Sequence, residues 1–266
     1  MKSQEWETPQ NKILFGDCFK IMPTLPEESI DLILTDPPYN IANKNKLTKV
    51  SGEITSNKEA WGNDFLDNYT DMQFLQFMQD CSDNFYRLLK PGGSVIIFYD
   101  RGKPFFLKPF YDKFTLKNVF AFVKQNPIPH FRKNNYRSGY EQAMWFSKGT
   151  PKTFNFINQY EMINVFVGNI GQKETSHPTE KPNWMIKPLI LRHSDPGQVI
   201  MDPFSGSGTI CKYAKYFDRE YIGIEKEKEF YDMSVKRVNG IIDIYQDEKE
   251  EWVECGLIPA PEEEES

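Results

Sequence analysis

The sequence predicts an α/β fold in which a mostly parallel sheet carries helices on both faces. Its 266 residues, 39% of them hydrophobic, suffice for one large domain with a core of its own. Apolar runs of strand length alternate with stretches of helical periodicity along most of the chain. Strands and helices that alternate in this way form parallel sheets, because each crossover helix packs on a face of the sheet.

The first hundred residues contain three predicted strands and one long helix. The strands are apolar runs at 13–14, 29–35 and 94–99. Residues 71–89 place apolar side chains at helical spacing, which predicts a helix. The run at 29–35 stops at Asp36-Pro37-Pro38, because proline cannot donate ladder hydrogen bonds. Pro91-Gly92-Gly93 predicts a turn ahead of the third strand.

The remaining chain continues the alternation. Further strands are predicted at 119–124, 142–146, 198–201 and 221–224, and helices at 210–217 and 228–242. Aromatic residues interleave with lysines over 105–114, a pattern that favours an amphipathic helix packed on the sheet over a nucleic-acid surface. The tail 259–266, with four consecutive glutamates, is predicted to be disordered. The folded domain is therefore expected over 1–258.

Charge is distributed unevenly along the chain. The formal net charge of −6 at first argues against a nucleic-acid partner. Residues 101–152, however, contain eleven Lys and Arg against two acids, whereas 225–266 contain fourteen acids against five Lys and Arg. Salt screens charge over about 10 Å, so local excess decides what a surface attracts. The middle of the chain is suited to a polyanion such as DNA, although a merely solvated basic face fits the counts equally well.

Cysteine and histidine patterns predict no metal site. Cys18, Cys81, Cys211 and Cys255 lie far apart without a C-x-x-C pair, and three histidines offer few ligands. Each cysteine is expected to be a small buried hydrophobe or a free thiol. No apolar run approaches a membrane span, and the first ten residues lack the apolar stretch of a signal peptide. A cytoplasmic protein without a membrane partner is expected.

The strongest local motif is Asp36-Pro37-Pro38-Tyr39, directly after a predicted buried strand. Ligands of open α/β sheets bind beyond the carboxyl ends of strands. The Asp36 carboxylate and the Pro37 carbonyl can each accept an N–H bond from an exocyclic amine and aim its lone pair at a methyl donor. Tyr39 offers a flat face on which an extruded base stacks. An ordinary strand-ending turn is the alternative interpretation of these four residues.

A second motif, Asp202-Pro203-Phe204-Ser205-Gly206-Ser207-Gly208-Thr209, follows a predicted strand and precedes a helix. Its glycines let a ligand approach the backbone closely, yet it is neither G-x-G-x-x-G nor a P-loop. Asp202 can face the ammonium of a methionine moiety, and backbone N–H groups at the helix start can face its carboxylate. Glu225 ends the next strand, near the spacing at which an acid holds ribose hydroxyls. A plain tight turn again remains the alternative.

Together the two motifs resemble the DNA amino-methyltransferases, the N6-adenine/N4-cytosine family, in the group whose catalytic motif precedes its cofactor motif. The resemblance covers about residues 12–240. It implies a single Rossmann-like domain with a seven-stranded sheet and S-adenosylmethionine as the methyl donor. It also implies small insertions at about 41–62 and 150–176 that face DNA, and a target base that is flipped out of the duplex.

Other segments extend the resemblance. Gly16-Asp17-Cys18 is similar to the segment that meets the cofactor adenine, and 88–97 to the next helix-turn-strand. Residues 124–129 and Tyr140-Glu141 resemble the lining of the base pocket, although many relatives carry His where this chain has Tyr140. His177-Pro178-Thr179-Glu180-Lys181-Pro182 resembles an element beside the cofactor. The cofactor residues implied by the resemblance are therefore Asp17, Cys18, Asp36, His177, Thr179 and Lys181.

The resemblance favours adenine N6 as the target, because Asp rather than Ser precedes Pro37-Pro38. Cytosine N4 stays an alternative, as does a catalytically silent DNA-binding subunit on the same scaffold. Arg132, Lys133 and Arg137 form a basic cluster expected to contact DNA phosphates. The stretch between Lys152 and His177 is short for a separate recognition domain. A homodimer and a partner restriction nuclease remain open.

Overall fold

The structure is a computed structural model that describes residues 10–40, 47–48, 54–55, 69–129, 134–171 and 180–240. Most of the predicted insertion 41–62, the end of the second insertion and the acidic tail lie outside the described residues. Within 41–62, β3 (Leu47–Thr48) and β4 (Ile54–Thr55) pair antiparallel.

One large sheet organises the described residues, with the strand order β1-β10-β9-β2-β5-β7-β6-β8. The bounds are β1 (Lys12–Phe15), β2 (Ile30–Thr35), β5 (Leu89–Tyr99), β6 (Thr115–Lys124), β7 (Tyr140–Ser147), β8 (Val165–Gly168), β9 (Val199–Asp202) and β10 (Glu220–Glu225). Only β7 runs antiparallel to its neighbours, β5 and β6. The expected mostly parallel sheet is therefore confirmed, with eight strands in place of seven.

The additional strand is β8, which lies at the edge of the sheet inside the predicted insertion 150–176. It pairs parallel to β6, with Ala121 opposite Val165. Val165 and Val167 point away from the core and are 41% and 57% exposed. Phe166 between them packs against the buried core. Four residues, of which only Phe166 packs a partly buried side chain on the core, give too weak an apolar pattern to predict a strand.

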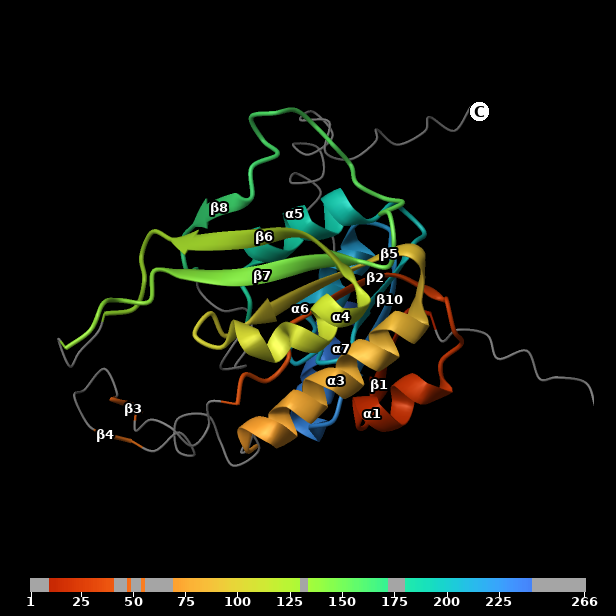
Figure 1. The fold of residues 1–266 in the computed structure, drawn as a ribbon, viewed down its shortest axis with the longest axis horizontal. Helices are drawn as coiled ribbons and strands as arrows, with labels where there is room; N and C mark the ends of the chain where they lie inside the picture. Colours follow the sequence, from red (N-terminus) through yellow and green to blue (C-terminus); the bar gives the residue numbers. More distant parts are fainter. Residues whose placement is uncertain are drawn as a thin grey trace, which may run out of the picture.

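Helices cover both faces of the sheet (Figure 1). One face carries α1 (Cys18–Ile21), η1 (Met22–Thr24), α3 (Asp71–Leu88), η2 (Pro104–Leu107) and α4 (Lys108–Lys113). The other carries α5 (Asn183–His193), α6 (Thr209–Tyr216) and α7 (Lys228–Asn239). The predicted amphipathic helix at 105–114 is confirmed as η2 and α4, with Phe106, Phe110 and Phe114 buried. Cys18, Cys81 and Cys211 are buried free thiols, as expected.

The predicted turn at Pro91-Gly92-Gly93 is wrong in one respect, because these residues lie within β5. Leu89 pairs with Ile30, and Ser94 pairs with Leu32, so a single residue of β2 opposes four residues of β5. The extra residues form a bulge, in which Gly92 has a φ of +85°. The sequence signal for a turn therefore marks an irregularity that the strand accommodates.

The centre of the sheet is a topological switch point. The chain leaves β2 through α3 toward β5 on one side, and it leaves β9 through α6 toward β10 on the other. The neighbouring strands β2 and β9 end at Thr35 and Asp202. Ligands of open α/β sheets bind where the connections diverge in this way, beyond the carboxyl ends of the strands. The two sequence motifs follow these two strands.

Candidate active site

The turn after β2 is held in one conformation by its own residues. Pro37 and Pro38 fix φ and bring no backbone N–H, so neither can extend the ladder. Asn40 is buried with a φ of +53°, which an asparagine tolerates better than most residues. Its side-chain amide accepts from the Tyr69 N–H at 3.0 Å and donates to the Tyr69 carbonyl at 2.9 Å. This two-point contact fastens the turn to the start of α3.

Four charged side chains form a row beside this turn. Lys181 Nζ lies 2.9 Å from Asp36 Oδ2 and 2.7 Å from Glu141 Oε2. Glu141 also forms an ion pair with Lys124. The Tyr39 hydroxyl donates to Asp36 Oδ1. Asp36, Lys181, Glu141 and Lys124 come from four different segments of the chain, so the fold assembles a row of alternating charge that no local sequence pattern contains.

The surroundings of these groups shift their titration. Burial raises the pKa of Asp36, and Lys181 and the Tyr39 hydroxyl counteract part of that effect. Burial would also raise the pKa of Glu141, but Lys181 and Lys124 together lower it to about 2. For Lys181, burial lowers the pKa while Asp36, Tyr39 and Glu141 raise it, and the net pKa lies well above the usual value. Lys181 therefore stays a cation, and Glu141 stays an anion, at neutral pH.

Asp202 connects this row to the glycine-rich turn. Its Oδ1 accepts a hydrogen bond of 2.8 Å from the Thr35 hydroxyl and one of 3.2 Å from the Phe204 N–H. The residue is only 3% exposed. Burial raises the pKa of Asp202 to about 7, despite the bonds from Thr35 and Phe204. An ammonium group of a ligand would stabilise this carboxylate as an anion.

The glycine-rich turn has the open backbone that a bound cofactor requires. Gly206 and Gly208 have φ values of +49° and +76°, and Gly208 is the N-cap of α6. A Cβ at Gly208 would lie 2.9 Å from Ser234 Cβ, so this position has no room for a side chain. The hydroxyl of Ser205 is buried and without a hydrogen-bond partner in the described part of the chain. The positive φ values at Gly206 and Gly208, and the lack of room at Gly208, explain why glycine stands at these two positions.

Glu225 lies at the end of β10 beside the same turn. Its Oε2 accepts from the Gly206 N–H and its Oε1 from the Glu227 N–H, both at 2.8 Å. These two bonds leave lone pairs for the hydroxyls of a ribose. The Glu225 carbonyl accepts from the Gly16 N–H at 2.9 Å, which joins the end of β1 to the site. The residues present therefore fit S-adenosylmethionine: Asp202 for its ammonium, the turn for its carboxylate and Glu225 for its ribose.

Asp17 and Cys18 lie next to this edge but have structural roles of their own. The Asp17 side chain caps α1 by accepting from the Phe19 N–H at 3.0 Å. Cys18 is buried in the core, and burial raises the pKa of its thiol to about 12. A cofactor contact of either residue remains a prediction.

A buried ion pair connects the turn to the segment that carries Lys181. Arg237 Nη2 on α7 lies 2.6 Å from Glu180 Oε1, and both side chains are less than a tenth exposed. Arg237 Nη1 donates to the Thr209 hydroxyl at 2.8 Å and to the Ser207 hydroxyl at 3.1 Å. Glu180 is thus fixed to the cofactor side, while the next residue, Lys181, reaches the Asp36 side.

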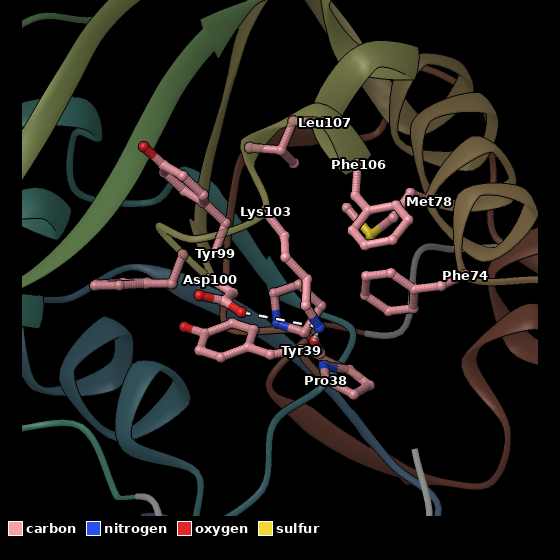
Figure 2. A pocket seen from close by; sticks show the side chains of 11 residues that line it. Pro38, Tyr39, Phe74, Met78, Tyr99, Asp100, Lys103, Phe106 and Leu107 are labelled. Atoms are coloured by element: carbon pink, nitrogen blue, oxygen red, sulfur yellow. Dashed lines mark hydrogen bonds and ion pairs between the residues drawn. The ribbon is translucent and has the colours of Figure 1, made fainter. Parts of the chain in front are cut away.

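A pocket of about 280 Å³ opens beside Tyr39 (Figure 2). Phe74 and Met78 from α3, with Phe106 from η2, form one wall, and Tyr39 and Tyr99 form the opposite wall. Lys103 reaches in between, where its Nζ donates to the Asn40 carbonyl at 2.9 Å and lies 3.9 Å from Asp100 Oδ2. Walls of aromatic rings suit a flat, partly apolar ligand.

The structure therefore brings most of the predicted site residues to one edge of the sheet: Asp17, Cys18, Asp36 to Tyr39, Lys181, Asp202 to Thr209 and Glu225. His177, Thr179, Arg132 and Lys133 lie outside the described residues. Arg137 is exposed and donates to the Pro127 carbonyl.

Sequence reasoning gave no individual role to Thr35, Lys124, Glu141 or Arg237. Lys124 and Glu141 stand in segments that resemble a base-pocket lining, so the resemblance offered a signal for them. Thr35 and Arg237 had no such signal, because their partners are distant in the sequence.

Two further findings concern the described residues alone. They contain no group of three or more His, Cys, Asp or Glu arranged to hold a metal ion. No helix among them is both long and apolar enough to cross a membrane.

Comparison with known proteins identifies the family. The family model of the N6/N4 DNA methylases matches residues 30–236, a span that holds both motifs and the row of charges. This chain belongs to the N6/N4 DNA methylase family. Its methylase relatives include the Type II methyltransferase M.HinfI of Haemophilus influenzae, 31% identical over 87% of this chain and 69% of the relative. The Type II methyltransferase M2.MboI of Moraxella bovis is 29% identical over 88% of this chain and 89% of the relative.

Solved structures of DNA methyltransferases are similar to this chain. The M1.HpyAVI–SAM complex is 26% identical with a TM-score of 0.65, covering 86% of this chain and 98% of that one. The cytosine-N4-specific PvuII DNA methyltransferase has a TM-score of 0.68 at 19% identity, covering 94% of this chain and 93% of that one. The second likeness shows the fold alone.

Proposed function

We propose that this DNA methylase transfers the methyl group of S-adenosylmethionine to the N6 amino group of adenine in DNA. The observation that carries the proposal is the position of Asp36. It follows β2 directly at the switch point, and the Thr35–Asp202 hydrogen bond of 2.8 Å links it to the cofactor turn. An amine held by Asp36 would therefore lie beside a methyl donor held by Asp202 and the glycine-rich turn.

The chemistry asks little of the protein beyond geometry and charge. S-adenosylmethionine supplies a methyl group on a sulfonium, and the electron pair of the broken C–S bond stays with sulfur in S-adenosylhomocysteine. The Asp36 carboxylate has about four acceptor sites, of which Tyr39 and Lys181 occupy two. The remaining sites can accept an amino N–H and orient the nitrogen lone pair toward the methyl carbon. The methylated nitrogen then releases one proton, for which Asp36 is the nearest base.

The base must leave the duplex to reach this site, because its amino group is otherwise paired. Tyr39 offers a ring face for the extruded base, and stacking on an aromatic side chain is worth about 1–3 kcal/mol. Adenine is favoured over cytosine by the aspartate at position 36, as the family resemblance implies.

The test is direct. DNA from a host without methyltransferases of its own is digested to nucleosides after expression of this chain, and the products are separated by mass spectrometry. N6-methyladenine is the expected product, and it should be strongly reduced when Asp36→Ala is expressed at the same level. N4-methylcytosine would replace the adenine assignment while keeping the site. The absence of both, with wild-type protein that binds S-adenosylmethionine, would refute methyl transfer to these amino groups.

A further inference from the structure

We propose that Lys181 is a positioning residue for the catalytic carboxylate of Asp36, and that Glu141 holds Lys181 in place. The inference rests on the proposed function and gives Lys181 a role other than the cofactor contact that the family resemblance implied. Its basis is the row of Asp36, Lys181, Glu141 and Lys124, in which each cation lies between or beside carboxylates from other segments.

The contacts of the Lys181 ammonium fix the position of Asp36. Two of its three hydrogens have short acceptors, at 2.9 Å on Asp36 and 2.7 Å on Glu141. The third neighbour, the Tyr39 hydroxyl, lies at 3.5 Å, too far for a strong hydrogen bond. The Lys181 side chain is 12% exposed, so water screens these charges little. Asp36 is thereby held from two sides, at Oδ2 by Lys181 and at Oδ1 by Tyr39.

Lys181 is poorly suited to carry protons away from Asp36. A proton that passed from Asp36 through Lys181 would have to reside on Glu141. Burial favours the neutral form of Glu141, but Lys181 and Lys124 outweigh it and hold the pKa at about 2, so Glu141 is a very weak base. Lys181 therefore keeps its proton and acts through charge and geometry, as a fixed donor that keeps the Asp36 anion aligned.

The backbone before Lys181 is anchored independently of this row. Pro182 follows Lys181, and a residue before proline is confined to extended conformations. Neighbouring side chains of an extended segment point to opposite sides. Glu180 accordingly pairs with Arg237 on the cofactor side, and Lys181 meets Asp36 on the other. Arg237 of α7 therefore fixes Glu180, the neighbour of Lys181, and also contacts Thr209 at the glycine-rich turn.

The experiment compares Lys181→Met with the wild-type chain. The rate of a single turnover is measured between pH 5 and 9 with radiolabelled S-adenosylmethionine and unmethylated DNA. Cofactor affinity is measured by calorimetry and folding by thermal unfolding. A matched control is Lys90→Met. It removes a Lys–Asp contact of 2.7 Å between Lys90 of β5 and Asp31 of β2, at the end of β2 away from the site.

We expect Lys181→Met to lower the single-turnover rate at least roughly tenfold, with cofactor affinity within about twofold of wild type. Asp36 faces Lys181, Tyr39, Glu141 and Asp202, and Lys181 is the one cation among these four. Without it the carboxyl ionises at higher pH, so the acid limb of the rate profile should move upward. Lys181→Arg, which keeps the charge, should restore the acid limb of the wild type. Lys90→Met should leave rate and profile unchanged.

Glu141→Gln alone supplies a second measurement in case Lys181→Met unfolds, because a loosened Lys181 should lower the single-turnover rate while cofactor affinity stays unchanged. If Glu141 acts through Lys181, the double variant should be little slower than Lys181→Met alone. Lost cofactor binding with an unmoved acid limb would instead make Lys181 a cofactor residue and overturn the inference. So would a Lys181→Met rate equal to wild type, or additive effects of the two substitutions. If the wild-type chain methylates no DNA, the proposed function fails, and that result is separate from all of these.

Discussion

The hydroxyl of Thr35 donates a 2.8 Å hydrogen bond to Oδ1 of Asp202, and both residues are buried at the carboxyl ends of adjacent strands. Thr35 directly precedes Asp36, the proposed catalytic carboxylate, and Asp202 begins the turn that we propose holds the cofactor. The two motifs are thus joined by one bond between residues 167 positions apart in the chain. In the proposed mechanism, this bond fixes the distance between the carboxylate that holds the amine and the turn that holds the methyl donor.

Thr35→Val tests this junction, because valine keeps the shape and removes the donor. The free energy of unfolding should fall by about 1–3 kcal/mol at pH 8, where Asp202 is charged, and by less at pH 5. Cofactor affinity should fall as well. Urea unfolding and calorimetry measure both. Thr24→Val is the control, since its hydroxyl donates at 2.7 Å to the Ile21 carbonyl on the surface; equal losses in the two variants would contradict the prediction.

Asp202→Asn should stabilise the fold while weakening cofactor binding. Burial raises the pKa of Asp202 to about 7 from about 3.9 in the unfolded chain. The folded state thus holds a proton that the unfolded state has lost, so wild-type stability falls as pH rises from about 4 to 7. The advantage of Asp202→Asn should grow over this window by up to about 1.4 kcal/mol per pH unit.

Cofactor binding should show the opposite trend. The affinity of wild type for S-adenosylmethionine should rise with pH through about 7, as Asp202 becomes the anion that faces the ammonium. Asp202→Asn should be weaker and show no such rise. Thermal unfolding measures the stability and calorimetry the cofactor affinity of both proteins across pH 5–8. If Asp202→Asn were less stable than wild type at pH 8, the proposed raised pKa of Asp202 would be contradicted.

Asp36→Ala should lower turnover at least roughly tenfold, because a charge-assisted acceptor worth about 1.5–3 kcal/mol is lost. Cofactor affinity should stay near wild type, since Asp202 and Glu225 remain. Steady-state kinetics with labelled cofactor measures the change. Unchanged turnover would show that the amine binds elsewhere.

Gly208→Ala should weaken cofactor binding by deforming the turn. Its φ is +76°, and the added Cβ would lie 2.9 Å from Ser234 on α7. Gly149→Ala is a matched control, because Gly149 has a φ of +80° and open space around it. Both variants store similar backbone strain. Only Gly208→Ala should reduce affinity in calorimetry, and equal affinities would mean that the turn does not hold the cofactor.

DNA recognition is tested by salt dependence and by sequencing. Arg137→Ala should reduce the slope of log affinity against log salt by roughly one if Arg137 contacts a phosphate.

Because little chain separates Lys152 from His177, we also expect a short or relaxed target of a few base pairs. A genome-wide map of methylated positions checks this, and a long strict motif from a monomer would contradict it.

The fold was predictable from the sequence because most of its strands are short apolar runs that can be recognised from local sequence alone. Buried runs such as 29–35 have the length and composition of central strands, and Pro37 and Gly206 mark where they stop. The edge strand β8 was not predicted, because half of its side chains face outward and its pairing depends on β6. The bulge at Gly92 has the same proline and glycine signature as a turn, so local sequence does not distinguish the two.

The site was predictable only in part, for a different physical reason. Asp36 and Asp202 lie in motifs with characteristic neighbours, so their place at strand ends followed from local sequence. Lys181 was expected beside the cofactor, but its side chain reaches Asp36. The Lys181–Glu141 contact joins side chains 40 residues apart in the chain. Such long-range pairs depend on strand order, which one sequence does not specify.

The clasp between Asn40 and Tyr69 has a consequence for how this enzyme can diversify. It joins the two residues that flank segment 41–68, so for chain entropy that segment counts as a closed loop. Doubling the length of such a loop costs only about 0.6 kcal/mol of closure entropy. Mutation can therefore lengthen, shorten or rewrite this segment while Asp36 stays in place. We therefore expect segment 41–68 to tolerate exchange between homologues, because the clasp holds Asn40 and Tyr69 together whatever segment joins them.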